Sequence, residues 1–280
     1  MGKLLRLTVL AFFAMMIVSV AAGSVLAQGF PTKPIRIIVP YVPGGPTDIF
    51  ARIVAQKLSE NLGQQVIIDN RGGGNAIIGT EMVAKAPPDG YTLLFNSTGP
   101  IVTPGLYKTL PFDVEKDFEP ITLAVTSPNI LAAHPSFSAN TVKELIAMAK
   151  AKPDQLNCAI STLGSTNHLA LELFKSMAGT KMETISYKGA APALNALLGG
   201  HVPLMFNTIG LMVPHIKAGK LKALAVTSPK RTDIFPDIPA ISETLPGFEA
   251  ASWFAVWGPA GMQKEIVTRL NNEIDRKSVV

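Results

Sequence analysis

The chain has 280 residues, a formal net charge of +5, four histidines and one cysteine. Its Lys and Arg residues are scattered and no basic block carries aromatic residues, which argues against a nucleic-acid-binding protein. One cysteine excludes an internal disulfide, and the histidines show no metal-ligand spacing, so we expect no metal. The length suits two α/β lobes better than one open sheet.

The first 27 residues have the pattern of a secretory signal peptide. Two basic residues precede an apolar run from Val9 to Ala22, and small residues lead up to Ala27. We expect cleavage after Ala27, so that the mature chain begins at Gln28 and its formal charge becomes +5 − 2 = +3. The alternative, an uncleaved membrane anchor, fits less well because the apolar run is short.

The stretch from Pro34 to Asn70 predicts a strand, a glycine turn, a helix and a second strand. Ile35–Tyr41 is rich in β-branched residues, and the glycines of Pro43–Pro46 allow a tight turn. Thr47 or Asp48 is the predicted N-cap of the helix. Free backbone N–H groups at such a helix start suit a small anion, and a tight turn with no ligand is the alternative.

A second glycine-rich segment, Gly72–Gly74, has a layout that could hold a dinucleotide. Its spacing is G-x-G-x-x-I, and no acidic residue ends a strand about twenty residues further on. We therefore expect neither a nicotinamide nor a flavin cofactor.

Strands and helices alternate through the rest of the chain, which predicts a second, mostly parallel sheet. Thr141 and Glu144 have the spacing of a capping box at one helix start. The hexapeptide Leu123–Pro128 recurs letter for letter as Leu224–Pro229. Coincidence is one interpretation; the other is that these are two strands that cross between the lobes.

Short loops rich in Gly, Ser and Thr follow several predicted strands and precede helices. In open α/β sheets such loops line the crevice at the carboxyl ends of the strands. A cleft with neutral donors and helix N-termini suits a carboxylate bound through backbone N–H groups, hydroxyls and ordered water. The loops are Pro43–Asp48, Asn96–Gly99, Ser161–Thr166, Lys188–Ala190 and Asn207–Thr208.

The sequence offers little for catalysis. It has no G-x-S-x-G nucleophile elbow. Ser161 or Ser165 with His168 is the only nearby Ser–His candidate, and a hydrogen-bonded histidine in the first turn of a helix is the alternative. We therefore expect a binding protein, with a secreted hydrolase as a minor alternative.

Several long segments resemble one known family. They are PYVPGGPTDIFARIVAQKLSENLGQQVIIDN (40–70), SYKGAAPALNALLGG (186–200) and SWFAVWGPAG (252–261). With other segments that agree, they resemble the solute-binding receptors of tripartite tricarboxylate transporters, the Bug-type periplasmic receptors. The resemblance covers nearly the whole chain after Phe30. Similar proteins continue beyond Val280, so we expect a chain shortened at its C-terminus.

The resemblance implies an α/β fold of the type II, Venus-flytrap kind, with two lobes, mostly parallel sheets and paired hinge strands. We assign residues 28–125 and 226–280 to lobe 1 and 126–225 to lobe 2. The implied function is a periplasmic receptor, expected to be monomeric, that captures a small organic carboxylate and delivers it to membrane transporter subunits. A sensory input to a signalling system and a non-functional shortened product are alternatives.

The predicted ligand-binding residues come from the loops above, and the resemblance places the first-lobe and second-lobe loops on opposite sides of the ligand. In this arrangement Asp48 would orient water or loop N–H groups, since it would repel an anion; a simple N-cap is the alternative. The predicted residues are Tyr41, Pro43, Gly44, Gly45, Thr47, Asp48, Ser97, Thr98, Ser161, Thr162, Ser165, Thr166, His168, Lys188, Gly189 and Asn207.

Overall fold

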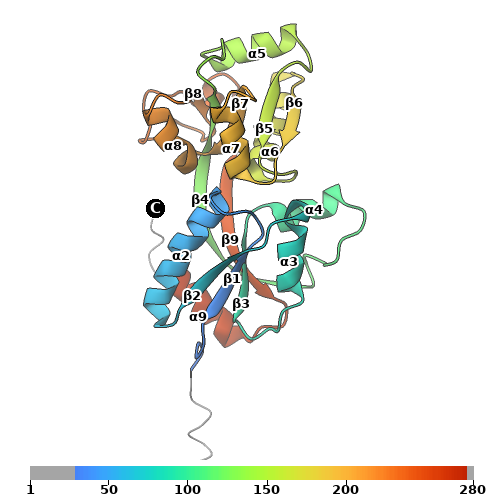
Figure 1. Cartoon of the computed structure of the whole chain (residues 1–280), viewed down its shortest axis with the longest axis vertical. Helices are drawn as coiled ribbons and strands as arrows, with labels where there is room; N and C mark the ends of the chain where they lie inside the picture. Colours follow the sequence, from blue (N-terminus) through green and yellow to red (C-terminus); the bar gives the residue numbers. More distant parts are fainter. Residues whose placement is uncertain (1–28, 276–280) are drawn as a thin grey trace, which may run out of the picture.

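The computed structural model describes residues 29–275, which form two α/β lobes joined by two long strands (Figure 1). Hydrogen bonding orders the strands β2-β1-β3-β9-β4-β7-β5-β6, with β8 also on β4. The strands are β1 (Ile35–Val39), β2 (Val66–Asn70), β3 (Thr92–Asn96), β4 (Phe118–Ala133), β5 (Asn157–Ile160), β6 (Glu183–Ser186), β7 (Leu204–Thr208), β8 (Lys222–Val226) and β9 (Ala251–Pro259). The α-helices are α2 (Pro46–Leu62), α3 (Ile77–Ala84), α4 (Gly99–Leu106), α5 (Val142–Ala151), α6 (Thr166–Ala178), α7 (Ala190–Leu198), α8 (Ile209–Lys217) and α9 (Lys264–Asp275); 3-10 turns lie at Gly74–Ala76 and Ile241–Glu243.

The first lobe is built on β1, which is apolar and buried except at one position, and pairs in parallel with β2 and β3. Helix α2 packs on this sheet through Ala51, Ala55 and Leu58. The predicted N-cap at Thr47 or Asp48 is wrong, because α2 begins at Pro46 with Gly45 as its N-cap. Proline suits the first helical position, where its missing N–H has no partner to lose.

The second lobe repeats the pattern, with β5 parallel to β6 and β7. Half of the predicted capping box forms at the start of α5: Glu144 N–H donates to Thr141 Oγ1 at 3.1 Å, but the Glu144 carboxylate accepts from Asn140 N–H at 2.7 Å rather than from Thr141 N–H. The Thr141 hydroxyl thus satisfies one N–H group that the first helical turn leaves without a partner, and Glu144 holds the residue before the N-cap.

Strands β4 and β9 run antiparallel between the lobes, and Figure 1 shows them as the connection from one lobe to the other. Pro128 of β4 pairs with Ala251 of β9, whereas the last part of β4, from Asn129, pairs with β7 and β8. One strand thus belongs to both lobes. The first copy of the repeated hexapeptide, Leu123–Pro128, lies in β4 and connects the lobes as predicted. The second copy, Leu224–Pro229, does not pair with it, because β9 is the neighbouring strand there. Strand β8 ends at Val226 and pairs with the second-lobe part of β4.

The predicted fold class is confirmed, but the sheet is mixed rather than mostly parallel. Strand β9 pairs antiparallel with both β3 and β4, and β4 pairs antiparallel with β7 and β8. The reason is that the chain leaves the first lobe along β4 and returns along β9, so the two connecting strands run in opposite directions. Only the βαβ units on either side keep the parallel pairing.

The segment after β8 packs on the second lobe. Ala240 is buried with Ile130 in one apolar cluster, and Ile241 and Phe248 are buried with Leu131 in another. We therefore propose that residues 226–250 belong to lobe 2 and that the chain returns to lobe 1 only at β9.

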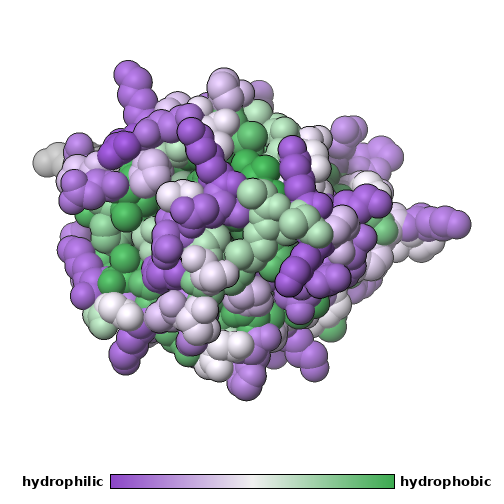
Figure 2. Space-filling model, turned by 90° about the horizontal axis from the view of Figure 1, so that it is seen from above, coloured by the Kyte–Doolittle hydropathy of each residue, from purple (hydrophilic) through white to green (hydrophobic). Residues whose placement is uncertain are grey.

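The surface seen from above in Figure 2 carries hydrophilic and hydrophobic residues interspersed. Within residues 29–275, the helices are all too short or too polar to cross a bilayer. The predicted signal peptide and its cleavage site after Ala27 lie outside the described residues.

Candidate functional site

A small cavity of about 40 Å³ lies between the lobes, where five loops meet. Each loop starts a helix: the helices are α2, α4, α6, α7 and α8. No charged side chain is among the described residues that line it. They are Tyr41, Val42, Gly45, Pro46, Thr47, Ser97, Thr98, Ser161, Ser165, Thr166, Asn167, Ala190, Asn207, Thr208, Ser252 and Phe254. We call this space the inner cavity.

The structure brings many of the predicted residues to this cavity. Those that line it are Tyr41, Gly45, Thr47, Ser97, Thr98, Ser161, Ser165, Thr166 and Asn207. Pro43, Gly44, Asp48, Thr162, His168, Lys188 and Gly189 are not part of its wall. Ligand contact by any of these residues stays a prediction.

Some residues of the wall were not among the predicted ligand-binding residues. They are Val42, Pro46, Asn167, Ala190, Thr208, Ser252 and Phe254. Pro46, Ala190 and Thr208 lie within the predicted loops, and Val42 and Asn167 are direct neighbours of predicted residues. Ser252 and Phe254 are different, because they reach the cavity on β9, whose course between the lobes no local pattern indicates.

The first-lobe loop is held by one buried carboxylate. Asp48 is 4% exposed; its Oδ2 accepts a hydrogen bond from Gly44 N–H at 3.0 Å, and its Oδ1 forms an ion pair with Arg52 Nη2 at 2.9 Å. Burial raises the pKa of Asp48, but the hydrogen bonds from Arg52 and Gly44 outweigh it and hold the pKa below its usual value. The carboxylate thus orients the loop backbone and takes no part in the cavity wall.

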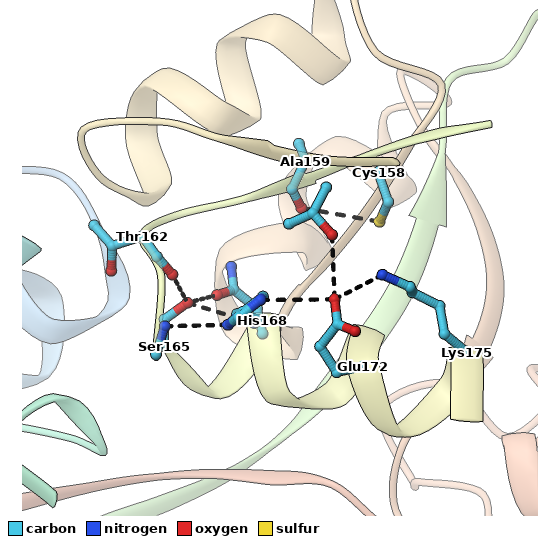
Figure 3. Close-up of polar contacts among 10 residues, drawn as sticks. Cys158, Ala159, Thr162, Ser165, His168, Glu172 and Lys175 are labelled. Atoms are coloured by element: carbon cyan, nitrogen blue, oxygen red, sulfur yellow. Dashed lines mark hydrogen bonds and ion pairs between the residues drawn. The ribbon is translucent and has the colours of Figure 1, made fainter. Parts of the chain in front are cut away.

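The second-lobe loop is held by neutral groups (Figure 3). Ser165 is the N-cap of α6, where its Oγ accepts from His168 N–H. Ser161 Oγ donates to Asn167 Oδ1 at 3.0 Å, and Ser165 Oγ also lies beside that oxygen. Asn167 therefore ties both serines to the first turn of α6.

His168 is engaged in the loop as well. Its Nδ1 accepts from Gly164 N–H at 3.1 Å, and its Nε2 lies 3.6 Å from Glu172 Oε1. Burial lowers the pKa of His168, which favours the neutral ring. Neither Ser161 nor Ser165 hydrogen-bonds the imidazole among the described contacts, so the Ser–His pair expected of a hydrolase is not formed.

The lobes touch each other beside the cavity. Thr98 Oγ1 of the first lobe donates to Gly164 O of the second at 2.8 Å. A Cβ added to Gly189 would lie 2.9 Å from Val42 Cγ2 across the cleft, so only glycine allows this approach. The structure thus has the lobes closed against each other.

A second, outer cavity of about 610 Å³ adjoins the inner one and shares Tyr41 and Val42 with it. Thr162 and Lys188, two of the predicted residues, line this outer cavity, and Lys188 is its one charged lining residue within the described part of the chain. A larger groove of about 1140 Å³ is lined by first-lobe and β9 residues around Phe112 and contains none of the predicted residues.

The described residues offer no evident site for a metal or a reactive thiol. No group of three or more His, Cys, Asp or Glu side chains that could hold a metal ion occurs within residues 29–275. Cys158 is buried on β5, and burial raises its pKa to about 12, so the thiol stays protonated.

Two closed lobes, a shared strand pair and an uncharged cavity at their junction define a two-lobed solute-binding protein. The chain belongs to the tripartite tricarboxylate transporter receptor family: the sequence pattern described as "Tripartite tricarboxylate transporter family receptor" matches residues 50–279. The predicted family is confirmed. Since its members are receptors, membership also agrees with a binding protein rather than an enzyme.

Known relatives cover most of the chain. BugT of Bordetella pertussis is 38% identical over 257 residues, which cover 91% of this chain and 79% of BugT. A protein of Pseudomonas sp. (strain P51), encoded between tcbD and tcbE, is 38% identical over 273 residues, which cover 97% of this chain and 81% of that protein. The expected shortening at the C-terminus stays a prediction, and residues 276–280 lie outside the described part.

Two similar structures contain small dicarboxylates. The R. palustris protein Rpa4515 with adipate has 40% identity and a TM-score of 0.84, over 88% of this chain and 83% of that one. MatC from Rhodopseudomonas palustris with bound malate has 31% identity and a TM-score of 0.83, over 88% and 85% of the two chains.

Proposed function

We propose that this chain is a periplasmic receptor that captures a small organic carboxylate, most simply a dicarboxylate, between its lobes. The observation that carries the proposal is the convergence of five helix starts on one uncharged cavity. Helix N-termini carry partial positive charge and N–H groups without partners, so together they favour an anion without a dedicated Arg or Lys.

Helix α2 supplies the clearest of these donors. The first hydrogen bond at its start is Ile49 N–H to Gly45 O at 3.0 Å, so the N–H groups of Thr47 and Asp48 precede it. Thr47 lines the cavity, and the Asp48 carboxylate holds Gly44 on the other side of the turn. A carboxylate oxygen at this helix start would receive backbone donors that the fold leaves free.

The sizes of the two cavities favour a ligand with two ends. The inner cavity holds on the order of three water molecules, enough for a carboxylate group but not for a whole dicarboxylic acid. The rest of such a ligand would extend past Tyr41 and Val42 into the outer cavity, toward Lys188. The adipate and malate of the two similar structures have this chemistry.

The remaining parts of the proposal rest on the family. Export through the signal peptide, with cleavage after Ala27, would place the receptor in the periplasm. A monomer that closes on its ligand could then present the closed surface to the membrane subunits of a transporter.

Calorimetric titration of the mature chain, residues 28–280, tests the proposal. Adipate, L-malate and benzoate are titrated, with putrescine as a cationic control of similar length. We expect one-to-one binding of at least one carboxylate and none of putrescine. Binding of putrescine alone would contradict a carboxylate receptor. So would a result in which no member of the panel binds and none produces a thermal shift.

A further inference from the structure

The outer cavity, of about 610 Å³, is built by both lobes. The first lobe contributes the glycine-rich segment 72–77 and Tyr107, which follows α4, and the second lobe contributes Tyr187 and Lys188. This cavity is far larger than the inner one, with which it shares two wall residues. A ligand that reaches from the inner into the outer cavity would therefore contact both lobes along its length.

Tyrosines make up much of the outer-cavity wall. The protein has four tyrosines, and three of them, Tyr41, Tyr107 and Tyr187, line this cavity. Two of these phenol groups have partners inside the protein: Tyr41 OH donates to Asn96 Oδ1 at 3.2 Å, and Asn75 Nδ2 donates to the Tyr107 hydroxyl. Aromatic rings whose hydroxyls are anchored in this way offer apolar surface in a fixed orientation. The wall thus suits an apolar ligand body, such as a methylene chain or a ring.

Lys188 gives the outer cavity a positive charge that the protein does not neutralise. Its side chain is exposed, and its ammonium group has no ion-pair or hydrogen-bond partner among residues 29–275. No Asp or Glu is among the described residues that line the cavity. The charge is therefore available to an anionic group that enters from the inner cavity.

The backbone holds Lys188 where the two cavities meet. On its second-lobe side, Tyr187 N–H and Gly189 N–H donate to the carbonyl oxygens of residues 160 and 161, at 3.1 and 3.0 Å. On its first-lobe side, a Cβ added to Gly189 would lie 2.9 Å from Val42 Cγ2, and Val42 lines both cavities. Closure of the lobes thus sets Lys188 beside the path from the inner to the outer cavity.

We propose that the outer cavity is a second ligand subsite, in which Tyr107 and Tyr187 pack on the apolar body of a dicarboxylate and Lys188 pairs with its far carboxylate. This inference rests on the proposed function and adds the kind of dicarboxylate: one with an apolar body that spans the two cavities, rather than a short hydroxylated acid. The inner cavity has no charged side chain among its described lining residues. Lys188 would therefore distinguish a second carboxylate from an uncharged or cationic end.

The test uses ligands that differ only at the far end. Adipate, hexanoate and 6-aminohexanoate carry a carboxylate, a methyl group and an ammonium there, and L-malate is the short hydroxylated probe. Calorimetry at pH 7.5 and low salt, where exposed charges are least screened, measures all four on the full mature chain. Lys188→Met removes the charge but keeps an unbranched side chain, and Lys188→Glu reverses the charge. Lys220→Met, at an exposed second-lobe lysine that lines neither cavity, is the matched control. Tyr107→Ala tests the apolar wall.

We expect the parent chain to bind adipate about fivefold more tightly than hexanoate, as an exposed ion pair allows, and more tightly than L-malate. Lys188→Met should abolish the advantage of adipate while hexanoate stays within about twofold, and Lys188→Glu should favour 6-aminohexanoate over adipate. Tyr107→Ala should weaken adipate and hexanoate alike, by about threefold, because both have the same apolar body. Lys220→Met should leave all affinities within about twofold.

Several results would overturn the inference and leave a carboxylate receptor intact. They are an unchanged ratio of adipate to hexanoate affinity in Lys188→Met, an equal loss in Lys188→Met and Lys220→Met, and an unchanged adipate affinity in Tyr107→Ala. A parent chain that binds L-malate at least as tightly as adipate, or benzoate but not adipate, would overturn it too. If the parent binds none of these carboxylates, the proposed function fails and this inference fails with it.

Discussion

The two loops that face each other across the cleft have similar composition but are held in different ways. The first-lobe loop, 43–48, depends on one buried charge, the Asp48 carboxylate paired with Arg52. The second-lobe loop, 161–168, depends on neutral contacts that meet at Asn167 and His168. Charge stabilises one side of the cleft and a hydroxyl–amide network stabilises the other.

This difference matters for how the site can bind. A single carboxylate behind the first-lobe loop orients Gly44 and leaves the N–H groups at the start of α2 free for a ligand. Ser161 and Ser165 of the second-lobe loop use their hydroxyl protons within the loop, so this loop can offer a ligand mainly the backbone N–H groups at the start of α6. Both lobes thus offer backbone donors, one beside a buried charge and the other beside neutral groups.

Removal of the charged anchor should have the largest effect. We expect Asp48→Ala to lower the free energy of unfolding by about 2–3 kcal/mol, because it removes the buried carboxylate that pairs with the half-exposed Arg52 and leaves Gly44 N–H without its acceptor. Chemical denaturation at pH 7 measures the change, with the exposed Asp233→Ala as control. A loss no larger than that of the control would show that the first-lobe loop does not depend on this charge.

Removal of the neutral anchor should cost less. We expect Asn167→Ala to lower the free energy of unfolding by about 1–2 kcal/mol, because Ser161 loses its acceptor whereas Ser165 keeps Thr162 O as its own. Asn195→Ala on exposed α7 is the matched control in the same denaturation series. An effect of Asn167→Ala as large as that of Asp48→Ala would erase the proposed contrast between the two loops.

Closure itself can be tested with a pair of glycines. Gly164 (φ +76) and Gly219 (φ +68) have similar backbone angles, but only the former has close neighbours: a Cβ added to Gly164 would lie 3.0 Å from Leu106 Cδ1 of the first lobe. Both Gly→Ala variants should lose about 1 kcal/mol of stability through backbone strain. Only Gly164→Ala should also weaken carboxylate binding, by several-fold. Equal affinities in the two variants would show that this contact does not limit closure.

The smallest effect expected is on the pH dependence of stability. Folding lowers the pKa of His168 from 6.5. The neutral ring therefore makes its full contribution to the free energy of unfolding above pH 6.5, and this contribution is lost as the pH falls through the lowered pKa of the folded chain. The pKa of Asp48 is lowered from 3.8, so its contribution is lost only below that pH. His168→Gln should reduce the loss of stability just below pH 6.5. Asp48→Asn should reduce the loss of stability below pH 3.8. A parent chain whose melting temperature does not fall between pH 6.5 and the acid limb would contradict the assignment for His168.

Local sequence signals predicted the elements that local contacts decide. The predicted helix start at Thr141, whose hydroxyl accepts from Glu144 N–H, agrees with the structure. The repeated hexapeptide could not show which strands connect the lobes, because Leu123–Pro128 and Leu224–Pro229 have identical sequences and therefore the same local propensities. Only pairing with distant strands makes the first copy part of a connecting strand and the second the end of β8.

The candidate site shows the same limit. The position of its loops followed from strand–loop–helix order, and most predicted residues of those loops line the inner cavity. Which side chains can donate to a ligand could not be predicted, because the acceptors that occupy the hydroxyls, such as Gly164 O for Thr98 and Asn129 Oδ1 for Ser252, lie far along the chain. Composition indicates polar groups, but only the fold shows which of them are free.

The most direct test of the account is mass spectrometry of small molecules released when the purified mature chain is denatured. Five helix starts around an uncharged, closed cavity predict that a single small carboxylate is released in near-stoichiometric amount. Release of a cation or an uncharged compound in that amount would contradict the account. So would an empty protein that shows no thermal shift with any carboxylate of the panel.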